Sequence, residues 1–287
     1  MPETLEYAAP AAPLADPIPL RRRLAAEAVG TFLLIFFGCG SMAVDAAYGG
    51  AVGHVGIGIV WGVTVMALIY AVGDVSGAHF NPAVSFAFWL SGRFKGRDAL
   101  AFSGVQIVAA TVAALGLLGS FPQNDDLGQT LPGGTQVHES VRNFSGGSLM
   151  IQGELVLLPA REPEVTFVRS VWYYDVLRAF SFEVVLTFAL VFVILCVAIG
   201  SKERGLMAGI AIGGTVGICA LAAGPVCRAS MNPARSIGPA VAALDFTHLW
   251  IYCLAPMLGA AAAVGAWTFI YRHPRPGREV HAVTKPS

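Results

Sequence analysis

The sequence predicts an all-α membrane protein in which six transmembrane helices and two half-length helices form an inverted repeat. Three observations support this fold class: an apolar composition, six apolar stretches of bilayer length, and two copies of the triplet Asn-Pro-Ala. Hydrophobic residues make up 55% of the 287 residues and charged residues 13%, with a mean hydropathy of +0.66. A soluble domain carries roughly 25% charged residues, so most of this chain is expected to lie in lipid.

Six stretches are long and apolar enough to cross a bilayer, which takes about 20 residues. They are Leu24–Val44, Val55–Val72, Ala99–Phe121, Val176–Ile199, Leu206–Ala223 and Phe246–Tyr271. Two further apolar runs, Pro82–Leu90 and Pro233–Leu244, are too short to cross. Half-length helices are tolerated at membrane depth only where they are buried in protein or line a watery cavity.

Each short run begins at an Asn-Pro-Ala triplet, Asn81-Pro82-Ala83 or Asn232-Pro233-Ala234, and the two asparagines are 151 residues apart. Proline suits the first position of a helix because its missing N–H would have no intrahelical partner there. Asparagine is a favoured N-cap, and its amide group can also donate hydrogen bonds. The pair predicts two half-helices whose N-terminal ends, each carrying about +0.5 charge, face one another.

The chain also contains an internal repeat. The pattern Glu-x-x-x-Thr-Phe begins at Glu27 in the first stretch and again at Glu183 in the fourth, 156 residues later. Each half then holds three spanning helices and one half-helix, and an odd number of spans inverts the second half relative to the first. Inverted repeats place their functional site near the bilayer midplane, which indicates a pore or a transporter rather than a receptor.

Positive charge predicts the orientation. Of the 18 Lys and Arg residues, twelve fall on one side of the six-span arrangement and six on the other. Because cytoplasmic loops carry the excess of Lys and Arg, both termini are expected in the cytoplasm. The twelve are Arg21, Arg22, Arg23, Arg93, Lys95, Arg97, Lys202, Arg204, Arg272, Arg275, Arg278 and Lys285.

The expected organisation is a disordered cytoplasmic tail at 1–20, a membrane domain at 21–273 and a second cytoplasmic tail at 274–287. Within the membrane domain, a first repeat (21–121) and a second repeat (176–273) flank an external insert at 122–175. An alternating run near Ser148 to Leu158 leaves two alternatives for the insert. It is either a short β-hairpin over the outer mouth or a disordered loop.

Other residue patterns indicate packing rather than chemistry. Gly205, Gly209, Gly213 and Gly217 form a small-residue stripe that would let helix backbones approach closely in lipid. The five cysteines show no metal-ligand spacing, and four fall in apolar stretches, so neither a disulfide framework nor a metal or cofactor is expected. A net charge of zero implies no nucleic-acid partner.

The flanks of the two triplets resemble those of the major intrinsic protein family, the aquaporins and glycerol facilitators, over the region from Leu24 to about Tyr271. The resemblance is strongest to plant nodulin-like intrinsic proteins and their bacterial relatives. It rests on Ser76-Gly-Ala-His79-Phe-Asn81-Pro-Ala and on Gly224-Pro-Val with Ser230-Met-Asn232-Pro-Ala-Arg235-Ser-Ile-Gly-Pro239-Ala. It implies an aquaporin-like hourglass pore in each subunit of a homotetramer, with no enzymatic activity, in a bacterial inner (plasma) membrane.

The resemblance also implies a selectivity filter at Trp61, Ala220, Ala229 and Arg235, with Asn81 and Asn232 donating to solutes at mid-pore. Water-specific members of the family carry a smaller aromatic residue at the first of these positions and histidine at the second. Trp61 and Ala220 therefore imply a wider, half-apolar constriction. Two alternatives stay open: Trp61 as a core or lipid-facing aromatic, and Arg235 in a structural salt bridge.

Several further residues receive roles from the resemblance. Glu27 and Glu183 are expected to support the loops before the half-helices, with a proton relay as the alternative. His79 is expected in the inner vestibule. Cys227 is expected on the external side of the pore, either as an ordinary small loop residue, the favoured alternative, or as a candidate for mercurial block. Ser236 resembles the pattern shared by water channels and nodulin-like proteins, whereas Tyr252 departs from the aromatic pair of water channels.

These expectations predict a passive channel for water and small uncharged solutes that excludes ions and protons. Glycerol, urea and undissociated metalloid acids such as arsenite belong to the expected solute class. A water-selective aquaporin is the alternative, and a secondary transporter is a more remote one. A transporter would need a coupling site, for which Glu27 and Glu183 are the acids available within the spans.

Overall fold

The computed structural model describes residues 18–122, 127–133, 148–151, 154–157, 172–198 and 207–271. Both predicted tails lie outside these ranges, except for residues 18–20, as do the basic residues at 202–204 and 272–285. In chain order the elements are α1 (Leu20–Ala47), α2 (Gly53–Ser76), α3 (Pro82–Leu90), α4 (Gly96–Ser120), β1 (Ser148–Ile151), β2 (Glu154–Leu157), α5 (Trp172–Ala198), α7 (Ala208–Cys227), α8 (Pro233–Ala243) and α9 (Leu249–Tyr271).

Six of these helices are long and apolar enough to cross a membrane, and the predicted all-α fold with six spanning helices and two half-helices is confirmed. The half-helix α3 has the predicted bounds, Pro82–Leu90, and α8 ends one residue before the prediction, at Ala243. By contrast, α1 begins at Leu20, four residues earlier than predicted, because Arg21–Arg23 lower the local hydropathy without interrupting the helix.

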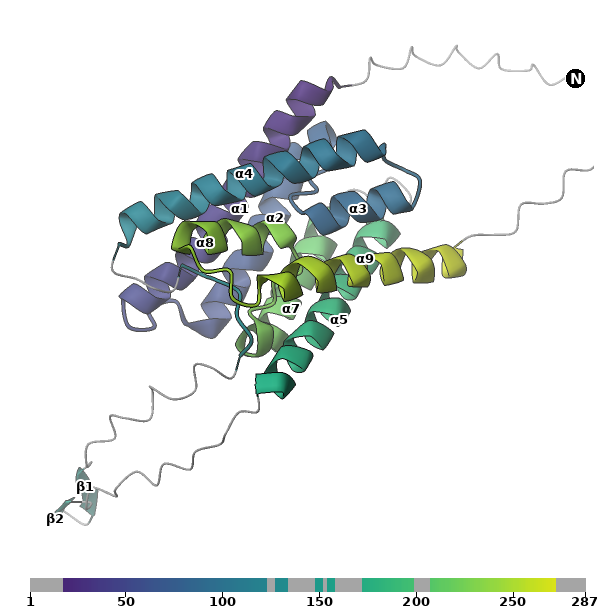
Figure 1. Cartoon of the computed structure of the whole chain (residues 1–287). Helices are drawn as coiled ribbons and strands as arrows, with labels where there is room; N and C mark the ends of the chain where they lie inside the picture. The colour runs from purple at the N-terminus through teal and green to yellow at the C-terminus, as the bar shows by residue number, and fades with distance from the viewer. Residues whose placement is uncertain are drawn as a thin grey trace, which may run out of the picture.

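The two half-helices lie between the long helices α4 and α9 (Figure 1), and each of them contacts both. Asn81 caps α3, since its side-chain oxygen accepts from the Ala83 N–H at 2.8 Å. Asn232 caps α8 in the same way, accepting from the Ala234 N–H at 3.0 Å. Spanning helices from both halves of the chain therefore enclose the half-helices, as membrane-depth half-helices require.

The glycine stripe forms part of the packing between α2 and α7. A Cβ atom on Gly213 would lie 2.5 Å from the Gly62 carbonyl oxygen, and one on Gly62 would lie 2.8 Å from the Gly213 carbonyl oxygen. Gly209 faces the ring of Tyr70, whereas Gly205 lies outside the described residues. The two halves of the chain thus meet backbone against backbone, which is the packing predicted for this stripe.

Two parts of the predicted insert are described. The strands β1 and β2 pair in an antiparallel hairpin, with Ser148 opposite Leu157 and Ile151 opposite Glu154. A hairpin thus forms in this part of the insert, and its place over the outer mouth stays a prediction. Residues 127–133 form a second described segment, which the sequence did not predict to be buried. Leu127 is 1% exposed, and the Gly133 N–H donates to the Val226 carbonyl at 2.7 Å.

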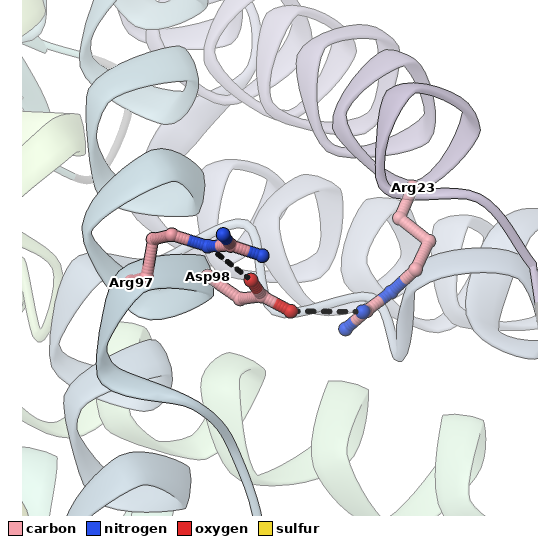
Figure 2. Close-up of polar contacts among 3 residues, drawn as sticks. All are labelled: Arg23, Arg97 and Asp98. Carbon is pink, nitrogen blue, oxygen red and sulfur yellow. Dashed lines mark hydrogen bonds and ion pairs between the residues drawn. The ribbon is translucent and has the colours of Figure 1, made fainter.

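At one end of the bundle an ion-pair cluster joins the first turns of α1 and α4 (Figure 2). Arg23 Nη1 lies 3.4 Å from one oxygen of Asp98, and Arg97 Nε lies 3.7 Å from the other. The Arg23 guanidinium also lies over the rings of Phe94 and Phe102, at 5.0 and 5.1 Å from their centroids. Asp98 therefore fixes the start of α1 against the start of α4.

Substitution of a glycine at the α2–α7 contact tests the close backbone packing of these two helices. Gly213→Ala should destabilise the protein by about 1–3 kcal/mol, the usual cost of overpacking, because the new methyl group would meet the α2 backbone. The neighbouring Gly214→Ala is the matched control, since a Cβ there meets no atom within 4 Å. Thermal unfolding in detergent measures both, and equal midpoints would contradict the packing described.

Candidate functional site

The N-terminal ends of the two half-helices meet through a pair of reciprocal hydrogen bonds. Asn81 Nδ2 donates to the Met231 carbonyl at 2.8 Å, and Asn232 Nδ2 donates to the Phe80 carbonyl at 2.9 Å. Both asparagines are buried and line the same cavity. Because each side-chain amide has two N–H groups, one on each asparagine is left for a molecule in the cavity.

The loops that present these asparagines have a strained backbone. Ala78 and Phe80 before α3, and Ala229 and Met231 before α8, all have φ between 43° and 53°. Residues with a Cβ rarely adopt this left-handed conformation. Each such residue costs of order 1–3 kcal/mol and persists only where its surroundings enforce it. The loops therefore need strong hydrogen-bond partners.

The carboxylate of Glu27 is the partner in the first half. One oxygen accepts from the Ser76 hydroxyl at 2.7 Å and from the His79 N–H at 2.9 Å. The other accepts from the Phe80 N–H at 2.7 Å and from Gln106 Nε2 at 2.8 Å. Four hydrogen bonds from α2, α4 and the loop thus converge on one fully buried acid.

Glu183 is the corresponding partner in the second half, with fewer contacts. Its two oxygens accept from the Ser230 N–H at 2.6 Å and the Met231 N–H at 2.7 Å. Neither Glu183 nor Glu27 lines the cavity. Both acids therefore contact the loops in the manner predicted for structural support.

A single cavity of about 660 Å³ contains the predicted filter and mid-pore residues. Trp61, Ala220, Ala229 and Arg235 all line it, as do Asn81, Asn232 and His79. The cavity is also lined by Tyr70 and Asp74 near the C-terminal end of α2, and by Ala198 and Ala208, the last residue of α5 and the first of α7. The structure thus brings together residues that are up to 174 positions apart in the sequence.

Arg235 is only 2% exposed, and four neighbouring residues hold its guanidinium group in place. Its Nη1 atom donates to the Gly128 carbonyl and lies 3.6 Å from Cys39 Sγ. Its Nη2 atom lies 3.5 Å from Met42 Sδ, and its guanidinium carbon lies 4.9 Å from the Trp61 ring centroid. No carboxylate within the described residues forms an ion pair with Arg235, so the structural salt bridge is not found there.

The remaining predicted residues divide into two groups. His79 lines the cavity, stacks on Phe88 with ring centroids 4.7 Å apart, and shares a 3.0 Å hydrogen bond with Ser85 Oγ. Ser236 and Tyr252 are buried outside the cavity. The Ser236 hydroxyl lies 2.6 Å from that of Ser230, which is the counterpart of the His79–Ser85 contact.

The structure corrects the predicted position of Cys227. It was expected on the external side of the pore, yet it is fully buried and its thiol donates to the Ala223 carbonyl at 3.6 Å. It is the last residue of α7, and the helix places its side chain inside the bundle. Mercurial block through this thiol is therefore not expected.

Three contacts of the site were not predicted from the sequence: Gly128, Cys39 and Met42. Gly128 belongs to the insert, where composition indicated only a loop. Cys39 and Met42 lie within the first spanning helix, and an apolar stretch gives no signal for which of its residues contact a distant arginine.

The two glutamates allow a comparative prediction. In Glu27→Gln the new NH2 group would replace an oxygen that accepts two hydrogen bonds, whereas in Glu183→Gln it would replace an oxygen that accepts one. Hydrogen bonds to charged groups contribute about 1.5–3 kcal/mol each, so Glu27→Gln should lower the unfolding temperature more than Glu183→Gln does. Thermal unfolding in detergent tests this, and a larger effect at Glu183 would contradict it.

Comparison with known proteins agrees with this geometry. The family model described as "Major intrinsic protein" matches residues 16–269. The chain is 37% identical to Aquaporin NIP1-1 of Zea mays (92% of this chain, 79% of the relative), and 41% identical to Aquaporin NIP1-4 of Oryza sativa subsp. japonica (86% and 75%). Nodulin-26 of Glycine max is 38% identical (88% and 78%).

A solved structure has the same fold. The X-ray structure of the aquaglyceroporin from Plasmodium falciparum superimposes with a TM-score of 0.64 over 87% of this chain and 96% of that one, at 21% sequence identity. The match of the family model over almost the whole described helical region, together with relatives above 35% identity, identifies the family. This chain belongs to the major intrinsic protein family, a family of membrane channels.

Proposed function

We propose that the protein is a passive channel for water and small uncharged solutes, such as glycerol, urea or undissociated metalloid acids like arsenite. The observation that carries this proposal is the single cavity of about 660 Å³ lined by both capping asparagines and all four filter candidates. Relatives of this chain are named aquaporins, which supports water as one of the permeant molecules.

Charge at the centre of the cavity supports exclusion of cations. The N-terminal ends of α3 and α8 meet there, each carrying about half a positive charge, and Arg235 adds a full charge nearby. As in aquaporin-type channels generally, such positive ends exclude protons and cations. The free N–H groups of Asn81 and Asn232 can instead donate to the oxygen atoms of a neutral molecule.

The filter residues favour a solute larger than water. The side chains of Ala220 and Ala229 are single methyl groups, while Trp61 and Arg235 stack on each other along the cavity wall. A donor group beside an apolar surface suits a molecule that carries both hydroxyl groups and carbon atoms. The water-selective alternative would require a larger side chain where Ala220 stands.

A secondary transporter is less well supported by the geometry. Its coupling site would have to involve Glu27 or Glu183, and both accept hydrogen bonds from loop N–H groups instead of lining the cavity. Flux through the proposed channel should therefore need no proton or sodium gradient.

Assembly and location extend the proposal. The protein is an integral membrane protein with six spanning helices, and the proposed assembly is a homotetramer with both termini in the cytoplasm. The relatives named above come from plants, so a bacterial inner membrane stays a prediction from the resemblance. Crosslinking in native membranes and accessibility of terminal tags would test these points.

The size of residue 220 should determine solute flux. Ala220→Leu adds three carbons inside the cavity, and an added steric barrier of about 1.4 kcal/mol would lower glycerol permeability about tenfold. Water permeability should fall less, because water is smaller. Stopped-flow light scattering of proteoliposomes measures both rates.

Ala222→Leu is the matched control, because this exposed alanine is on the same helix but does not line the cavity. Unchanged glycerol flux in Ala220→Leu, with the control also unchanged, would mean that the assigned filter is wrong.

The donor groups at the centre give a second prediction. Aspartate in Asn232→Asp could still cap α8, but it could not donate to the Phe80 carbonyl and would bring a negative charge to the site. Neutral-solute flux should fall and a cation leak should appear. Conductance of planar bilayers measures the leak, and an electrically silent variant with normal water flux would refute the assigned role.

A further inference from the structure

The outer half of α1 contacts both large side chains of the proposed filter from behind. Gly38, Cys39 and Met42 share one face of this helix, since residues three and four apart are neighbours on a helix surface. All three are buried, and none lines the cavity. They form a second layer of residues, here called the α1 wall, between the filter and the rest of the bundle.

Gly38 contacts the indole of Trp61. A Cβ atom on Gly38 would lie 2.5 Å from both Cη2 and Cζ2 of Trp61 and 2.6 Å from Cε2. These separations are far below van der Waals contact, so the six-membered ring of the indole occupies the space that any larger residue on α1 would fill. Trp61 is 8% exposed, and its other surroundings include the Arg235 guanidinium and the cavity.

Cys39 and Met42 contact Arg235. Their sulfur atoms lie 3.6 and 3.5 Å from Nη1 and Nη2, on the same guanidinium that donates to the Gly128 carbonyl. Sulfur is a weak acceptor but a polarisable neighbour for a cation. These two residues of the wall thus limit how far the Arg235 side chain can move away from the cavity.

These contacts limit the directions in which the Trp61 and Arg235 side chains can move. The Trp61 ring already fills the space beside Gly38, which has no side chain, so Trp61 cannot move toward α1. It can move into the cavity, where space is empty. Arg235 is stopped on its α1 side by Cys39 and Met42. The positions of both filter side chains relative to the cavity therefore depend on the residues of the α1 wall.

We propose that the α1 wall, Gly38 with Cys39 and Met42, sets the width of the filter and so the largest solute that passes. The proposal rests on the proposed channel function and on the filter assigned above. The three residues are positioning residues, which act through Trp61 and Arg235 without touching the solute. The wall can be altered in both directions: a larger residue 38 narrows the filter and a smaller residue 42 widens it.

The narrowing arm uses Gly38→Ala. The new methyl group would displace the Trp61 ring into the cavity, so glycerol permeability should fall about tenfold while water permeability changes by less than about twofold. Gly104→Ala on α4 is the matched control, since a Cβ there meets no atom within 4 Å. In the double variant Gly38→Ala/Trp61→Phe the smaller ring should restore glycerol permeability.

The widening arm uses Met42→Ala, which removes the side chain behind Arg235. The guanidinium could then move away from the cavity, and the ratio of erythritol to glycerol permeability should rise about tenfold. Stopped-flow measurements on proteoliposomes with water, glycerol and erythritol give all rates. Size-exclusion chromatography and a melting temperature for each variant establish that it is folded.

The outcomes separate this inference from the proposed function. If Ala220→Leu changes glycerol flux but folded Gly38→Ala and Met42→Ala leave every permeability ratio unchanged, the α1 wall has no role in selectivity. Equal losses of water and glycerol in Gly38→Ala, without rescue by Trp61→Phe, would also overturn it. If Ala220→Leu itself has no effect, the filter assignment fails instead.

Discussion

The reciprocal hydrogen bonds between the two half-helices are the constraint on which the rest of the site depends. Each asparagine caps its own half-helix through its oxygen and joins the opposite loop through its nitrogen. This requires left-handed backbone at Phe80 and Met231, so that their carbonyls reach across. The strain in turn requires Glu27 and Glu183, whose carboxylates hold the same loops from behind.

Much of the architecture was predictable because lipid imposes simple rules. Spanning helices must be long and apolar, and Asn-Pro-Ala at the start of a short apolar run contains both an N-cap and a residue suited to the first helical turn. The bounds of α3 followed directly from these rules. The filter roles predicted for Trp61 and Ala220 came from family resemblance. A tryptophan or an alanine within an apolar stretch fits a core or a lipid-facing position equally well.

The surroundings of Arg235 could not be predicted in this way. Its contacts come from Gly128 in the insert and from Cys39 and Met42 on the first helix, and no local pattern joins segments so far apart. The predicted exposure of Cys227 was wrong for a related reason. Its distance from Asn232 in sequence suggested exposure, whereas the last turn of α7 directs its thiol back to the Ala223 carbonyl.

The cross-bonded centre also bears on how a duplicated chain can diverge. A change in either asparagine would deprive the other half of its partner, so neither copy can vary there alone. Beside the centre the two halves differ: His79 and Ser85 in one half correspond to Ser230 and Ser236 in the other, and each of these contacts stays within its own half. The repeated scaffold can therefore keep a shared middle while its two ends specialise, one with an imidazole and the other with a guanidinium.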